Sequence, residues 1–476
     1  MNKNPLGWHE PDDSTRLIVA IPPRSYFGGN DRENALTVVE SLKPIFPHLF
    51  LFDCEIYLFG AERDFAAHMA AARKFRPTVG LASPNACYGM LLNKRDSYCY
   101  YKNDPSFKKN TLRKLLTFGR PAALRGNIFT DELGVPLIML WDHLVTHAAQ
   151  FLIGWEPLPR VLSRPGCLDK LRQGLNGERF VHYVPDSGHI AVFERLGISR
   201  PGLLGRYVVP AHDFFLRATV EPLETLITDR VLFAGNLNSS GVMSAFGTDP
   251  VVAEVMDYVV NVKCREWATP AWHAYEKIAA QKVTEGVAEF DPDHSFFWSL
   301  GRELITNVVT TAFRTTVFKS IRSPIDFYGG FTDPDFMANL SGSGLFRMMG
   351  SVPLKNLGGI YAQYQFSIDV THTPFIKGSN AKVLDCFAAG GFMFVDWKDD
   401  LRRELGEVAE EFMYRDAEEL NSKIEALKAQ PGRRLEIIRA IRERISRDLN
   451  FITLLSGVIR RAHRGHRIAE PVVQYR

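Results

Sequence analysis

The stretch at residues 378–396, GSNAKVLDCFAAGGFMFVD, places two charged side chains at a spacing that could serve chemistry. Lys382 and Asp385 are three positions apart and share one face of a helix that we expect over residues 381–389. Gly390 would end this helix. The pattern predicts that Lys382 and Asp385 lie on an exposed polar face. The opposite face would pack on a sheet and is apolar: Val383, Leu384, Phe387 and Ala388.

The start of this helix has features of a phosphate-binding site. Ser379 or Asn380 is a suitable N-cap, and the helix N-terminus offers unpaired N–H groups and a partial positive charge. Lys377 and Lys382 add full charges, and Gly378 lets a ligand come close. The alternative is an ordinary capped helix, because most such helices at the ends of strands bind nothing.

If the site holds a diphosphate, Lys382→Ala removes a charge-assisted contact worth about 1.5–3 kcal/mol. A nucleoside diphosphate would then bind roughly 10- to 150-fold more weakly. Because we expect Lys382 to be exposed, we expect the same change to alter stability by no more than about 0.5 kcal/mol.

A second candidate turn lies in RVLFAGNLNSS, residues 230–240. A strand that ends at Gly235 and Asn236 could present backbone amides to a phosphate. Glycine at the end of a strand is also common for its backbone angles alone. The turn matches neither G-x-G-x-x-G nor a G-K-[ST] loop.

Asp142 ends the apolar stretch VPLIMLWD, a place where ligands of open α/β sheets gather. We take it as a candidate catalytic or acceptor-binding carboxylate, with a helix cap as the alternative. His143 and His147 are four apart, but the glutamate of a zinc-protease helix is missing at Leu144. The D-P-D sequences at 291–293 and 333–335 favour turns over a metal site. We therefore predict no metal.

Composition narrows the class of protein. The chain has 476 residues, which predicts two or three domains. Its net charge of +3 gives no reason to expect binding to nucleic acid. The six cysteines form no C-x-x-C pair, the first residues do not resemble a secretory signal, and no long apolar run occurs. These features favour a cytoplasmic location.

Apolar strands alternate with helical patterns through most of the chain, which predicts an α/β protein with parallel sheets. LFLFDCEIYLF, residues 49–59, is interpreted as one buried strand. We place a domain boundary near residue 225. Residues of about 245–321 are predicted to be a helical insertion in the second domain.

Five pieces of the second half occur in a familiar order and resemble the C-terminal domain of the spore-maturation-type glycosyltransferases. This GT-B group is related to the group-1 glycosyltransferases. The resemblance covers about residues 226–450, with the insertion unmatched. The pieces are RVLFAGN, FYGGF, GSVPLKNLGGIYAQYQFSIDVTH, GSNAKVLDCFAAGGFMFVDWKDDL and FMYRDAEELNSKIEAL.

The resemblance implies two Rossmann-like domains that face each other across a cleft. Residues 1–225 would hold the acceptor and 226–450 the nucleotide sugar, while a helix within 451–476 could pack back on the first domain. Lys382 takes the place of the family's arginine on the donor diphosphate, and Asp385 that of its glutamate, which would hold the ribose. Lys377 stands where the group-1 pattern has a further glutamate.

Further residues complete the implied donor site around Lys382 and Asp385. Lys377, Ser379 and Asn380 would join Lys382 on the phosphates, with Gly235 and Asn236 opposite. The backbone from Gly350 to Val352 would contact the base.

The implied activity is a metal-independent transfer of sugar from a nucleotide diphosphate sugar, with no cofactor, to an unknown glycan, protein or lipid-linked acceptor. One alternative is a structural or assembly protein with a degraded donor site, which Lys377 favours. Another is an enzyme that acts on the sugar nucleotide itself, such as an epimerase. The basic residues at 460–467 could touch an anionic membrane, although a solvated helix end is the simpler interpretation.

Overall fold

The chain forms two compact units in the computed structural model. Unit 1 comprises residues 1–185, 189–207 and 451–476, and unit 2 comprises residues 186–188 and 208–450. We expected a boundary near residue 225, whereas the units divide after Tyr207. The structure describes residues 12–22, 30–59, 61–82, 127–141, 168–169, 172, 175–177, 179–198, 204–217, 226–235, 249–330 and 345–464.

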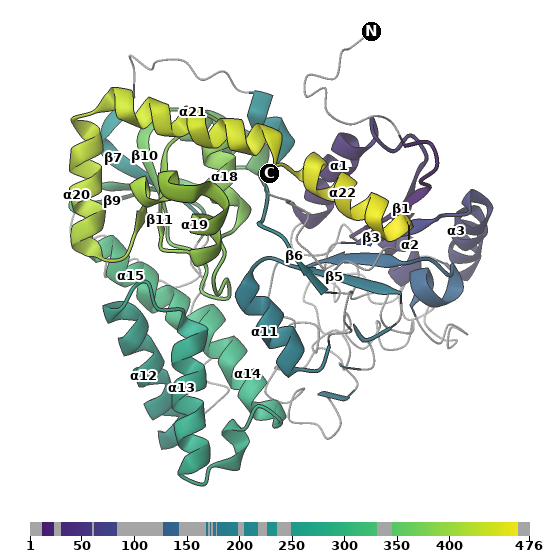
Figure 1. The fold of residues 1–476 in the computed structure, drawn as a ribbon, viewed down its shortest axis with the longest axis horizontal. Coiled ribbons are helices and arrows are strands. Elements are labelled where there is room, and N and C mark those ends of the chain that lie inside the picture. Colours follow the sequence, from purple (N-terminus) through teal and green to yellow (C-terminus); the bar gives the residue numbers. More distant parts are fainter. Residues whose placement is uncertain are drawn as a thin grey trace. The chain divides into compact units, whose positions relative to one another are not determined.

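Unit 1 is built on a six-stranded sheet in the order β2-β1-β3-β4-β5-β6, with every pair parallel (Figure 1). Short apolar runs such as LIVAI and LIML form its strands, as expected for strands covered on both faces. The strands are β1 (Leu17–Ile21), β2 (Leu49–Asp53), β3 (Val79–Ala82), β4 (Leu137–Leu140), β5 (Phe180–Val184) and β6 (Leu204–Arg206).

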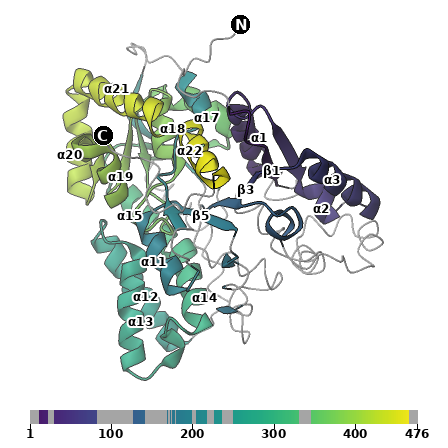
Figure 2. The same cartoon turned by 45° about the vertical axis from the view of Figure 1, so that its right-hand side comes forward.

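The last helix of the chain belongs to unit 1 although it follows unit 2 in the sequence. This helix, α22 (Phe451–His463), packs on α1 (Asn30–Leu42), β3 and β4 (Figure 2). The other helical elements of this part are α2 (Cys54–Phe59), α3 (Glu62–Phe75), η2 (Ile128–Glu132) and α11 (Ser187–Arg195), whose first two residues are counted in unit 2.

The prediction that residues 49–59 form one strand is wrong from Cys54 onward, where α2 begins. The side chain of Asp53 accepts a hydrogen bond from the backbone N–H of Glu55 at 3.0 Å. This contact turns the backbone into a helix start, so the strand ends at Asp53.

Unit 2 has a second six-stranded parallel sheet, in the order β12-β11-β10-β7-β8-β9. The predicted α/β class with two Rossmann-like sheets is therefore confirmed. The strands are β7 (Ile227–Ala234), β8 (Ile325–Tyr328), β9 (Phe346–Gly350), β10 (Tyr364–Asp369), β11 (Met393–Asp396) and β12 (Met413–Tyr414).

A helical insertion follows β7, and the remaining helices alternate with strands or close the unit. The insertion contains α12 (Pro250–Arg265), α13 (Ala271–Thr284), η6 (Ala288–Phe290), α14 (Ser295–Glu303), the π-helix η7 (Leu304–Val309) and α15 (Thr310–Ser320). The others are η4 (Asp213–Arg217), α17 (Leu354–Tyr361), α18 (Ala381–Ala388), α19 (Asp399–Leu405), η8 (Gly406–Glu411), α20 (Ala417–Lys428) and α21 (Pro431–Arg447). No helix in the part of the chain that the structure describes is long and apolar enough to cross a membrane.

Candidate functional site

The carboxyl ends of the parallel strands of unit 2 meet at one edge of the sheet, where α/β proteins usually bind ligands. Gly235 directly follows β7, Asp369 ends β10 and Asp396 ends β11. The helix α18 begins at this edge, after the loop 370–380 that leaves β10.

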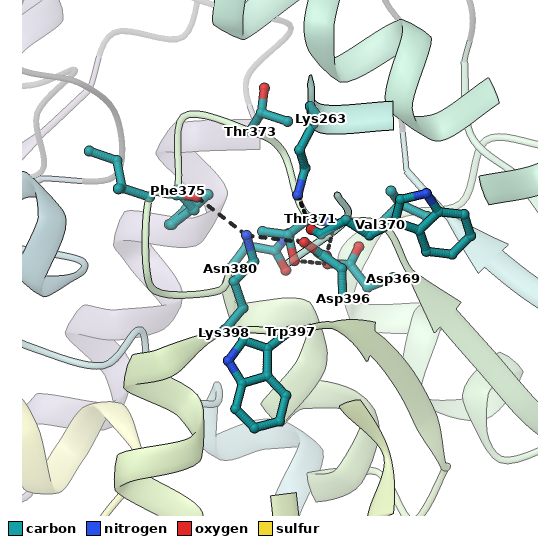
Figure 3. A network of polar contacts seen from close by, with 12 residues as sticks. Lys263, Asp369, Val370, Thr371, Thr373, Phe375, Asn380, Asp396, Trp397 and Lys398 are labelled. Atoms are coloured by element: carbon teal, nitrogen blue, oxygen red, sulfur yellow. Dashed lines mark hydrogen bonds and ion pairs between the residues drawn. The ribbon is translucent and has the colours of Figure 1, made fainter. Parts of the chain in front are cut away.

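Asn380 caps α18, and its side chain also contacts the sheet. Its Oδ1 accepts a hydrogen bond from the backbone N–H of Lys382 at 3.0 Å, and its Nδ2 donates to Asp369 Oδ2 at 3.3 Å. Figure 3 shows Asn380 beside Asp369 and Thr371. Gly390 follows the helix with φ +86°, a left-handed conformation that favours glycine. The predicted start and stop of this helix are both confirmed.

Lys382 does not lie on an exposed face, and that prediction is wrong. Its Nζ forms an ion pair with Asp369 Oδ1 at 2.8 Å and donates to the carbonyl oxygen of Ala234 at 3.1 Å. The side chain of Lys382 is 22% exposed and that of Asp369 is 1% exposed. The ends of β7 and β10 therefore cover the polar face of α18 at Lys382.

The pair has a clear electrostatic consequence. Burial acts to raise the pKa of Asp369, but the charge of Lys382 and its hydrogen bond bring that pKa below its ordinary value. An ammonium group has three N–H donors. Asp369 and Ala234 receive two of them, which leaves one donor of Lys382 for a ligand.

Gly235 keeps the space beside this ammonium open. A Cβ at Gly235 would lie 3.2 Å from Lys382 Nζ and 3.1 Å from the ring of Phe233. A Cβ at Gly329 would meet the carbonyl oxygen of Gly235 at 1.8 Å, so the turns after β7 and β8 touch through their backbones. Glycine is required at Gly329, whereas a side chain at Gly235 would crowd the ammonium of Lys382 and the ring of Phe233.

Asp385 is buried, and both of its oxygens accept hydrogen bonds from His212. The backbone N–H of His212 donates to Oδ1 at 2.7 Å, and Nδ1 lies 3.1 and 3.0 Å from the two oxygens. Burial acts to lower the pKa of His212, but Asp385 raises it above its ordinary value. Asp385 therefore ties α18 to the segment ahead of η4.

A second network lies beside the first, between β11 and the helical insertion (Figure 3). Asp396 pairs with Lys398 at 3.2 Å and accepts from the backbone N–H of Thr371 at 2.8 Å. Lys263 of α12 donates to the carbonyl of Trp267, and burial lowers its pKa to about 7 although Asp396 opposes this. No carboxylate within the described residues approaches Lys263 to 4.0 Å.

Sequence reasoning missed five charged or titratable residues at this edge, which are His212, Lys263, Asp369, Asp396 and Lys398. A signal was present for two of them. The apolar stretches FSID and FMFVD each end in aspartate, as does the stretch that ends at Asp142. The argument from strand ends that singles out Asp142 therefore holds for Asp369 and Asp396 as well.

The other predicted donor residues have varied surroundings. Ser379 is buried, and its hydroxyl has no hydrogen-bond partner among the described residues. Lys377 accepts at its backbone carbonyl from Asp400 N at 3.0 Å, and Gly378 is buried. Gly350 is the last residue of the edge strand β9 and has φ +87°. Val352 lies two residues beyond the end of this strand. Asp142 and Asn236 lie outside the described residues.

The described part of the chain contains no cluster of three or more His, Cys, Asp or Glu side chains that could hold a metal ion. At residues 291–293, the side chain of Asp291 accepts from the backbone N–H of Asp293 at 2.8 Å, as in the turn that we predicted. The other D-P-D sequence and the pair His143 and His147 lie outside the described residues.

Residues 325–453 match the model of a family described as glycosyl transferase-like. This region contains β8 to β12, α17 to α21 and the loop 370–380, and thus Asp369, Lys382 and Asp396, whereas β7 and α12 lie ahead of it. The predicted resemblance to a group-1 glycosyltransferase is confirmed by this match. No curated protein matches the chain.

The chain also matches solved structures, among them the following three. HepE of Anabaena in complex with UDP has 9% identity and a TM-score of 0.46, and the match covers 94% of this chain and 99% of that chain. Sucrose-phosphate synthase of Thermosynechococcus elongatus has 10% identity and a TM-score of 0.45, with the same coverage. A glycosyltransferase of Rickettsia africae has 10% identity and a TM-score of 0.44, again with the same coverage.

Proposed function

We propose that this glycosyltransferase binds a nucleotide diphosphate sugar at the carboxyl edge of the sheet in unit 2 and transfers the sugar to an acceptor without a metal ion. The family match over residues 325–453 supports the class of reaction. The site supports the class of donor, because its features suit the phosphate groups.

The observation that carries the proposal is the position of Lys382. Its ammonium lies in the first turn of α18, between the ends of β7 and β10, and keeps one donor beyond Asp369 and Ala234. The N-terminus of α18 adds unpaired N–H groups and a partial positive charge at the same place. The hydroxyl of Ser379, buried and without a partner among the described residues, supplies a further donor.

In the proposed reaction, the bond between the anomeric carbon and the diphosphate breaks while a bond to the acceptor oxygen forms. Negative charge develops on the leaving diphosphate, and Lys382 with the start of α18 would stabilise it. The acceptor proton must pass to a base, for which we propose Asp142. The acceptor itself is a glycan, a protein or a lipid-linked molecule.

The remaining donor contacts are proposals from the same site. Lys377, Gly378 and Asn380 would line the phosphates together with Gly235 and Asn236. The backbone of Gly350 and Val352 would meet the base. A carboxylate has about four acceptor positions, so Asp385 could hold a ribose hydroxyl while it keeps the hydrogen bonds from His212.

Calorimetry with UDP, GDP, CDP and ADP tests the donor site, and an activity assay in excess chelator tests the role of metal. We expect one nucleoside diphosphate to bind, and sugar transfer or donor hydrolysis to continue in excess chelator. Lys382→Ala should weaken this binding. Its matched control is Lys319→Ala, because Lys319 is an exposed lysine on α15 and its loss should leave binding unchanged. Activity that is lost in chelator and restored by manganese would refute metal independence.

One alternative is favoured by specific observations. Lys377 replaces a glutamate of the group-1 pattern, and the oxygens of Asp385 accept from His212. A structural or assembly protein with a degraded donor site would show both features. Absence of binding to all four nucleotides would support that alternative.

A further alternative is an enzyme that acts on the sugar nucleotide itself, such as an epimerase. It would convert the sugar nucleotide to an isomer without any acceptor and would release no free diphosphate.

A further inference from the structure

The helical insertion holds the loop that leads into the donor site. This loop, residues 370–380, leaves β10 and enters α18. At Thr373 it contacts two residues of the insertion, Ile305 in the π-helix η7 and Thr310 at the start of α15. π-helices occur mostly as single turns and frequently lie at functional sites.

The contacts form a compact cluster of hydroxyl groups. The hydroxyl of Thr373 donates to the carbonyl of Ile305, and its Oγ1 lies 2.6 Å from Oγ1 of Thr310. The backbone N–H of Thr373 donates to Thr310 Oγ1 at 3.2 Å. Each hydroxyl has one proton, so one consistent assignment has Thr373 donating to Ile305 and Thr310 donating to Thr373. Both threonines are buried, and His372 adds a contact from Nε2 to the carbonyl of Thr306 at 3.1 Å.

The same loop is held at other points by carboxylates. Asp396 accepts from the backbone N–H of Thr371 at 2.8 Å, and Asp186 accepts from that of Ile376 at 2.9 Å. Figure 3 shows Thr371 beside Asp396, with Thr373 farther along the loop. The insertion also contacts the start of the loop, where Arg314 of α15 donates to the carbonyl of Val370 at 3.1 Å. Of the loop residues tied to the insertion, Thr373 lies nearest to the cap at Asn380, seven residues ahead of it.

We propose that Thr373 is a positioning residue, through which the insertion holds the loop so that Asn380 and Lys382 present the start of α18 to the diphosphate. The inference rests on the proposed function, because it assigns the loop to the donor site. It gives the insertion a role in donor binding. The insertion lies outside residues 325–453, the region that matches the family model.

The test compares three variants of the full chain. Thr373→Val keeps the shape of the side chain but removes the hydroxyl, and Thr373→Ser keeps the hydroxyl. Thr316→Val is the matched control, because Thr316 lies on the same helix α15 and its hydroxyl donates to Ala312 O at 3.0 Å, away from the loop. The readouts are calorimetry with the nucleoside diphosphate that binds wild type best, and hydrogen exchange of backbone amides at 371–376.

We expect Thr373→Val to weaken binding about 10-fold, because the change removes both hydrogen bonds of this hydroxyl and loosens the loop ahead of α18. Exchange at 371–376 should become faster in this variant. Thr373→Ser should restore both readouts, and Thr316→Val should change neither. Unchanged exchange in Thr373→Val, or unchanged binding despite faster exchange, would overturn the inference. If wild type binds none of the nucleotides while Thr373→Val still speeds exchange, the loop anchor stands and the proposed function, with the donor role of Thr373, fails.

Discussion

The two sheets each pair a carboxylate at the end of a strand with a cation from a helix, but in different surroundings. In unit 1, Asp53 ends β2 and pairs with Arg32 of α1 at 2.8 Å. In unit 2, Asp369 ends β10 and pairs with Lys382 of α18 at the same distance. β2 is an edge strand, whereas β10 lies between β11 and β7. The side chain of Asp53 is accordingly 27% exposed and that of Asp369 is 1% exposed.

Because of this difference in burial, we expect the two ion pairs to contribute unequally to the free energy of unfolding. A partly exposed pair is screened by water and contributes little. A buried carboxylate that loses its cation has no water to replace it. The same strand-end motif can therefore be nearly neutral for folding in one sheet and essential in the other.

The largest effect is expected for Lys382→Ala. The change leaves Asp369 buried without its ammonium partner, so the free energy of unfolding should fall by about 3–5 kcal/mol. Nucleoside diphosphate binding should weaken roughly 10- to 150-fold, at about 1.4 kcal/mol per factor of ten. Urea unfolding and calorimetry measure the two quantities.

The double variant Lys382→Ala with Asp369→Asn is the control for this change. It removes the stranded charge, so it should recover part of the stability but none of the binding. A loss of stability below about 0.5 kcal/mol in Lys382→Ala would mean that the pair is unimportant and that the comparison with unit 1 is mistaken.

The dependence of stability on pH should be the next largest difference. The pKa of Asp369 is lower in the folded protein than its ordinary value of 3.8. The stability that this carboxylate contributes is therefore present above that value and is lost as the pH falls through its folded pKa. Urea unfolding of Asp369→Asn should show a shallower loss on acidification than wild type. Asp53→Asn should flatten the curve less, since its pair is partly exposed, and an equal effect of both changes would contradict the comparison.

The smallest effect is expected for Arg32→Ala. Arg32 also donates to the carbonyl of Pro22 at 3.0 Å, but its partner Asp53 is partly exposed, so water can solvate that carboxylate when the cation is removed. The free energy of unfolding should fall by about 0.2–1 kcal/mol. Chemical denaturation at low and high salt checks this, with a smaller difference expected at high salt. A loss as large as that of Lys382→Ala would show that burial does not separate the two pairs.

Local patterns were enough to predict most elements of the fold. Alternating apolar strands and helices gave both parallel sheets, and Asn380 and Gly390 marked the ends of α18. The strand β9 was missed because its residues are largely exposed, with Met349 at 39%. Such a strand lacks the continuous apolar run that identified its neighbours.

The contacts of the site could not be predicted in the same way. The helical period correctly put Lys382 and Asp385 on one face but says nothing about what covers that face. Asp369 is 13 positions from Lys382, and His212 is 173 positions from Asp385. Partners this far apart in the chain are brought together by the sheet and by the segment ahead of η4, and only the assembled fold reveals them.

The return of α22 to unit 1 determines the order in which the chain can complete its folding on the ribosome. Leu455, Val458 and Ile459 are fully buried in a helix that packs on α1, β3 and β4. At about 5–20 residues per second, residues 208–450 require roughly 12–50 seconds of synthesis. The apolar surface of α1, β3 and β4 that α22 covers stays exposed during this interval, so unit 1 can complete its packing only after α22 has emerged.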